Sequence, residues 1–107
     1  MKEPGLHRIL SGFIRMHILH HAAEHPVYGN WMLEELREHG YRLSPGTLYP
    51  MLRGLERDGL LRAAETGGTN RREYVITAEG ERALAEARLR LRELFREVGG
   101  ARGEGDR

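Results

Sequence analysis

Apolar residues in the first quarter of the chain recur every three or four positions, which is the periodicity of one helical face. They are Ile9, Leu10, Phe13, Ile14, Ile18 and Leu19. This pattern predicts a helix from about Leu6 to His25, because Pro26 cannot continue a helix. A second helix is predicted from about Asn30 to His39, with Gly40 as its C-terminal cap. Its inward side chains are Met32, Leu33 and Leu36.

The third predicted helix has the clearest start. Ser44 suits the N-cap position, and Pro45 suits the first helical position. Gly59 ends the helix. Its single apolar stripe consists of Leu48, Leu52 and Leu55. The sequence therefore predicts a short amphipathic helix with one buried face and one exposed face.

Beyond residue 59 the apolar pattern changes its period. Residues 60–65 and 72–77 predict two short strands, joined by a turn at residues 67–70. Thr77 then caps a last helix that extends to about Val98. Three helices followed by a hairpin form a winged helix-turn-helix, in which the third helix enters the major groove of DNA. We therefore expect a mostly α-helical winged helix-turn-helix fold with one β-hairpin and an added C-terminal helix.

This order of elements divides the chain into two functional parts. The winged helix-turn-helix domain is expected over residues 6–77, and a dimerisation helix over residues 78–98. Residues 1–5 and 99–107 are expected to be disordered, because the polar, glycine-rich tail cannot bury an apolar face.

The last predicted helix carries an apolar stripe with alternating three- and four-residue spacing, which is typical of a helix packed against another helix. Its members are Leu84, Ala87, Leu91, Leu94 and Val98. The stripe predicts a homodimer interface, and packing against its own domain is the alternative. A two-fold dimer would bind two half-sites about 34 Å apart on a pseudo-palindromic operator in double-stranded DNA.

The net charge of the chain is only +1, but its basic residues are concentrated in one segment. Residues 42–72 contain six arginines against three acidic residues. The candidate DNA-contacting residues are Ser44, Thr47, Tyr49, Pro50, Arg53, Arg57, Arg71 and Arg72. Arg53 and Arg57 are candidates for contacts in the groove, where arginine binds guanine edges or phosphate. Arg71 and Arg72 follow the predicted turn and would contact phosphate; solvated surface arginines are the alternative.

The predicted third helix also carries a recognisable motif. Residues 43–61 have the sequence LSPGTLYPMLRGLERDGLL. This segment resembles the recognition helix of PadR-type regulators, whose pattern is roughly L-S-x-G-T-L-Y-P-x-L-x-x-L-E-x-x-G-L. The flanking segments P-x-Y-G at residues 26–29 and R-E-Y-x-x-T-x-x-G at residues 72–80 agree with it, and the similarity covers about residues 9–98.

The resemblance carries its own expectations of function. It implies a dimeric transcriptional regulator, usually a repressor, which a ligand or stress signal releases from DNA. The chain is similar to the short form of the family, with a single C-terminal helix for dimerisation. A metal-binding or protein-interaction module that uses the same scaffold without specific DNA binding is the alternative function.

Histidines crowd the end of the first predicted helix. His17, His21 and His25 share one helical face, and His20 lies beside them. Histidines one helical turn apart bind zinc or a similar ion through their imidazole nitrogens. His17 and His21 stand where the family pattern usually has apolar residues. Partly buried or solvated histidines without a ligand are the first interpretation of the cluster; a divalent metal such as zinc or cadmium as effector and a pH-responsive group are the alternatives.

Composition limits the remaining classes of function. The chain has no cysteine, which excludes disulfides and thiolate chemistry. It has neither an apolar run of about 20 residues nor a signal peptide at its N-terminus, so a cytoplasmic protein without membrane contact is expected. Residues 21–25 match the H-x-x-E-H motif of zinc peptidases, but no third ligand follows and the chain lacks room for a substrate cleft. We therefore predict that the protein is not an enzyme and requires no cofactor.

Trp31 offers one further binding possibility. Its ring would stack on a planar effector, and ordinary packing is the alternative.

Overall fold

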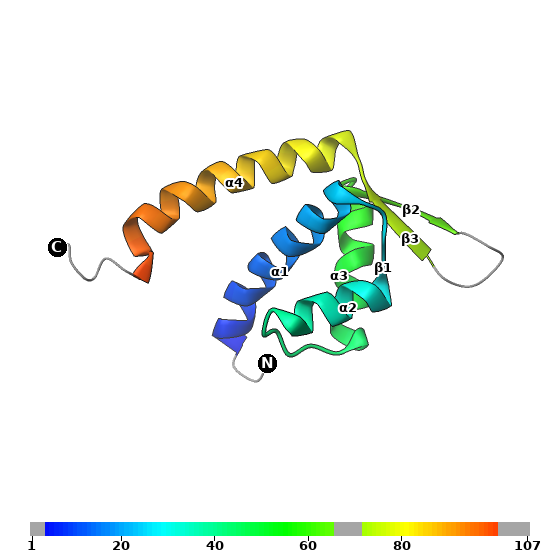
Figure 1. The fold of residues 1–107 in the computed structure, drawn as a ribbon, viewed down its shortest axis with the longest axis horizontal. Coiled ribbons are helices and arrows are strands. Elements are labelled where there is room, and N and C mark those ends of the chain that lie inside the picture. Colours follow the sequence, from blue (N-terminus) through cyan, green and yellow to red (C-terminus); the bar gives the residue numbers. More distant parts are fainter. Residues whose placement is uncertain (1–3, 66–71, 101–107) are drawn as a thin grey trace.

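The computed structural model describes residues 4–65 and 72–100 and confirms the predicted fold class, a mostly helical winged helix-turn-helix (Figure 1). The elements are α1 (Pro4–Glu24), β1 (Val27–Tyr28), α2 (Gly29–Glu38), α3 (Pro45–Arg57), β2 (Leu61–Glu65), β3 (Arg72–Ile76) and α4 (Ala78–Val98). Within the described ranges, no helix is both long and apolar enough to cross a membrane.

The first helix begins at Pro4, two residues before the expected start. Proline is well tolerated in a first helical turn, because the backbone N–H that it lacks would have no helical partner there. Pro4 and Gly5 were expected to be disordered and instead form the first turn of α1. At the other end, α4 ends at Val98 as predicted. Gly99 was expected to belong to a disordered tail and is instead the buried C-cap of α4, whereas residues 101–107 of that tail lie outside the described residues.

The sheet contains a strand that the sequence analysis did not predict. Its order is β1-β3-β2, and both neighbouring pairs are antiparallel. Val27 of β1 lies opposite Tyr74 of β3, and Leu61 of β2 lies opposite Ile76. The segment between α1 and α2 is therefore tied to the hairpin, so that the start of α2 lies beside β3.

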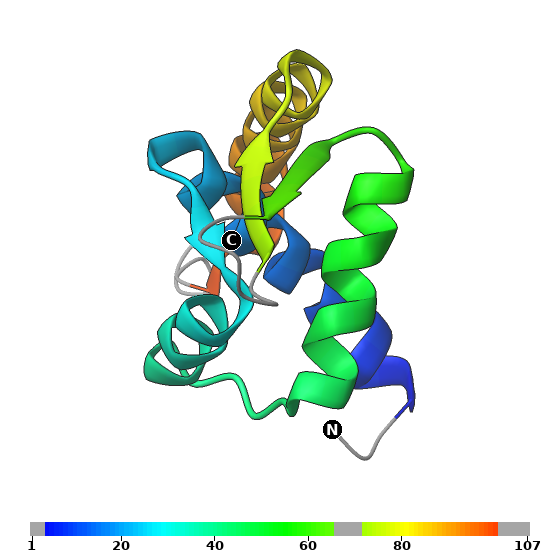
Figure 2. The same ribbon diagram turned by 90° about the vertical axis from the view of Figure 1, so that its right-hand side faces the viewer.

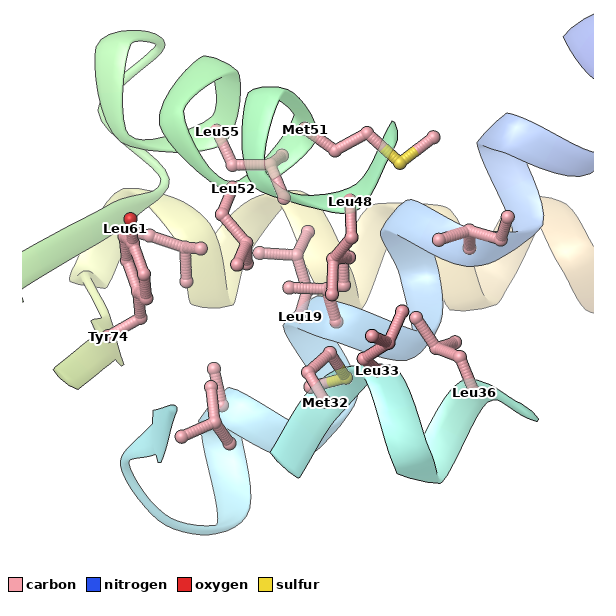
Figure 3. Packing of buried hydrophobic residues seen from close by; sticks show 14 of the residues in the cluster. Leu19, Met32, Leu33, Leu36, Leu48, Met51, Leu52, Leu55, Leu61 and Tyr74 are labelled. Carbon is pink, nitrogen blue, oxygen red and sulfur yellow. The ribbon is translucent and has the colours of Figure 1, made fainter. Parts of the chain in front are cut away.

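One apolar core holds the three N-terminal helices and the sheet together (Figure 3). Its fully buried side chains are Ile14, Ile18, Val27, Met32, Leu36, Leu48, Leu52 and Leu61. They come from α1, β1, α2, α3 and β2, and those of the three helices lie on the apolar faces that the sequence predicted. Figure 2 looks nearly along α4 and shows α3 standing beside β2 and β3.

Both helices of the helix-turn-helix end in the same way. After α2, Gly40 has a φ of +96° and donates its N–H to the carbonyl of Arg37, while Tyr41 donates to Leu36. After α3, Gly59 has a φ of +84°, and the same two backbone bonds are repeated. These are Schellman motifs, and the positive φ explains why each position carries glycine.

The start of α4 is fixed against the end of α3. Thr77 caps α4 by accepting a hydrogen bond from the N–H of Gly80 at 2.9 Å, and its hydroxyl donates to the carbonyl of Gly59 at 2.7 Å. Gly80 packs so closely that a Cβ there would overlap the carbonyl oxygen of Leu60 and lie 2.8 Å from Cγ1 of Ile76. This contact sets the direction in which α4 leaves the domain.

We expect Gly80→Ala to lower the free energy of unfolding by about 1–3 kcal/mol, because the added methyl overpacks a contact with backbone. Gly54→Ala is the matched control, since a Cβ at this helical position meets only the Arg57 guanidinium at 3.6 Å. Removing that glycine should stabilise the protein by about 0.5–1 kcal/mol. Urea unfolding followed by circular dichroism measures both changes. Equal stability of Gly80→Ala and the wild type would contradict the close contact.

Candidate nucleic-acid interface

The helix α3 presents opposite faces to the core and to solvent. Leu48, Met51, Leu52 and Leu55 are buried, and Met51 adds to the stripe that the sequence predicted. The remaining face is exposed, and it carries Tyr49, Pro50, Arg53 and Arg57. The structure thus places these four candidate residues on one accessible surface.

The start of α3 differs in detail from the prediction. Ser44 occupies the N-cap position, but its side chain makes no capping hydrogen bond. Its backbone carbonyl instead accepts hydrogen bonds from the N–H groups of Thr47 and Leu48, both at 3.0 Å. Because Pro45 fixes the backbone of the first turn, the helix starts here without help from the Ser44 hydroxyl. Ser44 is exposed and Thr47 is half-buried.

Tyr49 lies against the first residue of α2. A Cβ on Gly29 would come within 2.5 Å of Cε1 of the Tyr49 ring, so only glycine allows this packing. The ring is thereby held across the junction of α2 and α3 while 37% of the residue remains exposed. The glycine of the P-x-Y-G motif at residues 26–29 therefore makes room for the Tyr49 ring.

A hollow of about 380 Å³ joins the exposed face of α3 to the start of α2 and to β3. It is lined by Tyr28, Gly29, Asn30, Tyr49, Leu52, Arg53, Arg72 and Tyr74. Tyr28, Asn30 and Tyr74 were not among the predicted site residues, although the P-x-Y-G motif pointed to their neighbourhood. The first turns of α2 and α3 contain no acidic residue, so the positive ends of both helix dipoles lack a neutralising carboxylate there.

Arg72 is the first residue of β3, in the hairpin of β2 and β3 that forms the wing, and it contacts α3. Its guanidinium lies 3.5 Å from the carboxylate of Glu56 and 5.9 Å from the centroid of the Tyr74 ring. These contacts hold a positive charge at the edge of the hollow. Arg71, the other wing arginine that the sequence predicted, lies outside the described residues.

The apolar stripe of α4 divides into two parts. Leu84 is only 3% exposed and belongs to the core of its own domain, so it does not extend the predicted dimer surface. Ala87 is half-buried, whereas Leu91, Leu94 and Val98 are 43%, 48% and 63% exposed. The first turns of α4 thus pack within their own domain, which was the alternative to a dimer interface. The apolar side chains of the later turns are not covered in the single chain.

The first helix adds to this exposed surface. Leu6, Ile9 and Phe13 share one face of α1 and are 46%, 60% and 42% exposed. Phe13 and Leu91 line the same cavity of about 380 Å³ between α1 and α4. The exposed stripes of the two helices therefore adjoin where Phe13 and Leu91 line this cavity. We call the two stripes together the α1–α4 surface; it consists of Leu6, Ile9, Phe13, Leu91, Leu94, Phe95 and Val98.

The predicted histidine face is only partly brought together. Imidazole nitrogens of His17 and His21 lie close to one of His39, a residue that the sequence analysis did not include. His25 lies apart from this group, because its Nδ1 is 2.9 Å from the carbonyl oxygen of Pro26 and its ring packs edge-on against Trp31. The H-x-x-E-H segment therefore does not pair its two histidines around a common point. Trp31 also packs edge-on against the ring of His21, while 38% of the residue remains exposed.

Comparisons with known proteins agree on one family. A family model described as "Transcriptional regulator PadR-like family" matches residues 18–86. Transcriptional regulator Rv3488 of Mycobacterium tuberculosis is 54% identical over 87 residues, which are 79% of this chain and 81% of that protein.

Solved structures give the same result. A PadR family transcriptional regulator from Eggerthella lenta is 32% identical, with a TM-score of 0.77 over 94% of this chain and 90% of that one. A PadR-like transcriptional regulator from Bacillus cereus is 26% identical, with a TM-score of 0.79 over 92% of this chain and 99% of that one.

Proposed function

Because the chain belongs to the transcriptional regulator PadR-like family, we propose that it is a repressor that binds a pseudo-palindromic operator as a homodimer and leaves DNA when an effector binds. The family's members are transcriptional regulators, so the protein is a regulator and not an enzyme. The observation that carries the proposal is the shared surface of α3, the start of α2 and β3, where Tyr49, Arg53 and Arg72 line one hollow.

The roles on this surface follow from its chemistry. Arg53 is exposed on α3 and reaches into the major groove, where a guanidinium forms two hydrogen bonds with a guanine edge. Tyr49, which packs against Gly29, positions α3 against the DNA backbone. Ser44 and Thr47 contribute hydroxyl groups at the N-terminus of α3. Arg72 lies on the wing and binds phosphate. The start of α2 adds a helix dipole that favours phosphate.

The homodimer is supported by the α1–α4 surface. Soluble monomers seldom expose a large continuous apolar surface, and a second copy of the same surface would cover it by two-fold symmetry. Two copies of α3 would then face DNA about one helical turn apart, as two half-sites require.

Release by an effector is supported by the position of the cavity between α1 and α4. Phe13, Leu84, Arg88 and Leu91 are among its lining residues, so one wall belongs to the proposed dimer surface. A ligand bound there would change the angle between the two DNA-binding domains of the dimer. The spacing of the two copies of α3 would change as a result. An effector that left operator affinity unchanged would rule this step out.

The test is fluorescence anisotropy with labelled DNA from upstream of the protein's own gene, and with sites selected from random DNA. Each neutralised phosphate contributes about 0.9 to the slope of log affinity against log salt, so Arg71 and Arg72 from two protomers give a slope of about −3.6. Tight binding with such a slope, and weak binding to unrelated DNA, is the expected result. If no selected sequence binds better than random DNA, the chain is a binding module of another kind and the proposal fails.

A further inference from the structure

Three histidines from two different helices converge on one point between α1 and α2. His17 and His21 lie one turn apart on α1, and His39 is the C-cap of α2. One ring nitrogen of each lies within 4.8 Å of the other two. The ring centroids of His17 and His39 are 4.9 Å apart, and those of His21 and His39 are 6.5 Å apart.

A carboxylate contacts two of these three histidines. Oε2 of Glu35 lies 3.5 Å from Nε2 of His21 and 3.1 Å from Nε2 of His39. Glu35 is one helical turn before His39, and its side chain is 24% exposed, against 12% for His21 and 49% for His39. Three imidazole nitrogens and one carboxylate oxygen form a ligand set that zinc accepts in tetrahedral geometry.

The surroundings favour the form of histidine that binds metal. Burial lowers the pKa of His17, and the neighbouring imidazoles of His39, His21 and His20 lower it further. Burial also lowers the pKa of His21, although the Glu35 carboxylate opposes this effect. Both shifts favour the neutral imidazole, which is the form with a free nitrogen for a metal.

We propose that His17, His21 and His39, with Glu35 as the fourth ligand, bind a divalent transition metal of the zinc class. The ligands are nitrogen and oxygen without any thiolate, which suits zinc, nickel or cobalt rather than calcium or magnesium. The Schellman motif after α2 fixes the backbone at His39, so one ligand is held in place before the metal arrives.

A second group in the described part of the chain is a weaker candidate. His20, His21 and Glu24 also bring ligand atoms within 4.8 Å of one another. However, Nη2 of Arg88 lies 3.1 Å from Nδ1 of His20, and this fixed positive charge opposes a second cation. All three ligands of this group come from α1, so a metal there would not connect two elements.

The proposed site would join two parts with different tasks. The helix α1 carries part of the α1–α4 surface, and α2 begins beside Tyr49 in the hollow that faces DNA. A metal between His17, His21 and His39 would fix the angle between these helices. Its use as the effector signal rests on the proposed function, whereas the binding of metal does not.

The test is a titration of the metal-free, full-length protein with Zn²⁺ in competition with a chromogenic chelator. We expect one Zn²⁺ per chain. His39→Gln should weaken binding roughly 100-fold or more, because losing even an outer hydrogen-bond partner of a ligand costs about 10–100-fold. Co²⁺ should give the visible absorption bands of a tetrahedral site in the wild type and lose them in His39→Gln. Zn²⁺ should also raise the Tm of the wild type but not that of His39→Gln.

Two variants make the result specific. His25→Gln removes a histidine outside the group and should bind Zn²⁺ like the wild type, and so should His20→Gln. His39 is exposed, so its replacement leaves the core intact, and circular dichroism verifies the fold. Equal Zn²⁺ affinity in His39→Gln and the wild type would overturn the proposal, as would a loss seen only in His20→Gln. None of these measurements uses DNA, so a failure here is separate from a failure of operator binding.

Discussion

Leu94→Glu should convert the dimer into a monomer and weaken operator binding about 100-fold or more. Leu94 is 48% exposed in the single chain and lies on the α1–α4 surface. In the proposed dimer the new carboxylate would be buried without a partner, and such a charge costs about 3–5 kcal/mol. Two-fold symmetry places the change twice in each interface. A monomer then binds one half-site and loses the avidity of two linked contacts, which is worth about 10²–10⁴.

Leu89→Glu is the matched control for this prediction. Leu89 is also an exposed leucine of α4, at 54%, but it lies two residues before Leu91 and hence about 200° around the helix. The same substitution there should leave both the dimer and operator binding intact. Analytical ultracentrifugation gives the oligomeric state, and anisotropy gives the affinity. A Leu94→Glu protein that remains a dimer would show that the subunits meet through another surface.

The local signals in the sequence were enough to predict most of the fold. Ser44 and Pro45 mark the start of α3 and Gly59 its end, because proline and glycine restrict or free the backbone at these positions irrespective of distant contacts. Thr77 marks the start of α4 by another local signal, because its side chain accepts a hydrogen bond from the N–H of Gly80. The exposed face of α3 followed from the spacing of its leucines alone.

The features that the sequence did not predict depend on contacts between distant residues. The strand β1 has only two residues, too few to show a period, and it exists because Val27 and Tyr28 pair with β3. His39 joins His17 and His21 only after α1 and α2 have packed, so helical spacing selected His25 instead. The apolar stripe of α4 could not distinguish Leu84, which is buried in its own domain, from the exposed residues that follow it.

Arg53→Ala should cause the largest loss of sequence specificity. An arginine that binds a guanine edge contributes about 1–3 kcal/mol to discrimination, and a dimer loses it at both half-sites, or about 2–6 kcal/mol in total. Operator affinity should therefore fall by about 30-fold to 10⁴-fold, whereas affinity for unrelated DNA should change little. Anisotropy titrations with the selected operator and with a scrambled duplex measure both quantities at one salt concentration.

Substitutions at two other arginines distinguish sequence-specific contacts with bases from charge contacts with phosphate. Arg72→Ala removes a proposed phosphate contact, so it should weaken binding to both duplexes and reduce the salt slope by about 1.8 per dimer. Arg82→Ala removes the same charge from α4, where Arg82 pairs with Glu79 away from the hollow, and should change neither affinity. If Arg53→Ala instead weakened both duplexes equally, Arg53 would be a phosphate contact, and the bases would be read by other side chains of α3. If it weakened neither, the exposed face of α3 would not be the surface that enters the groove.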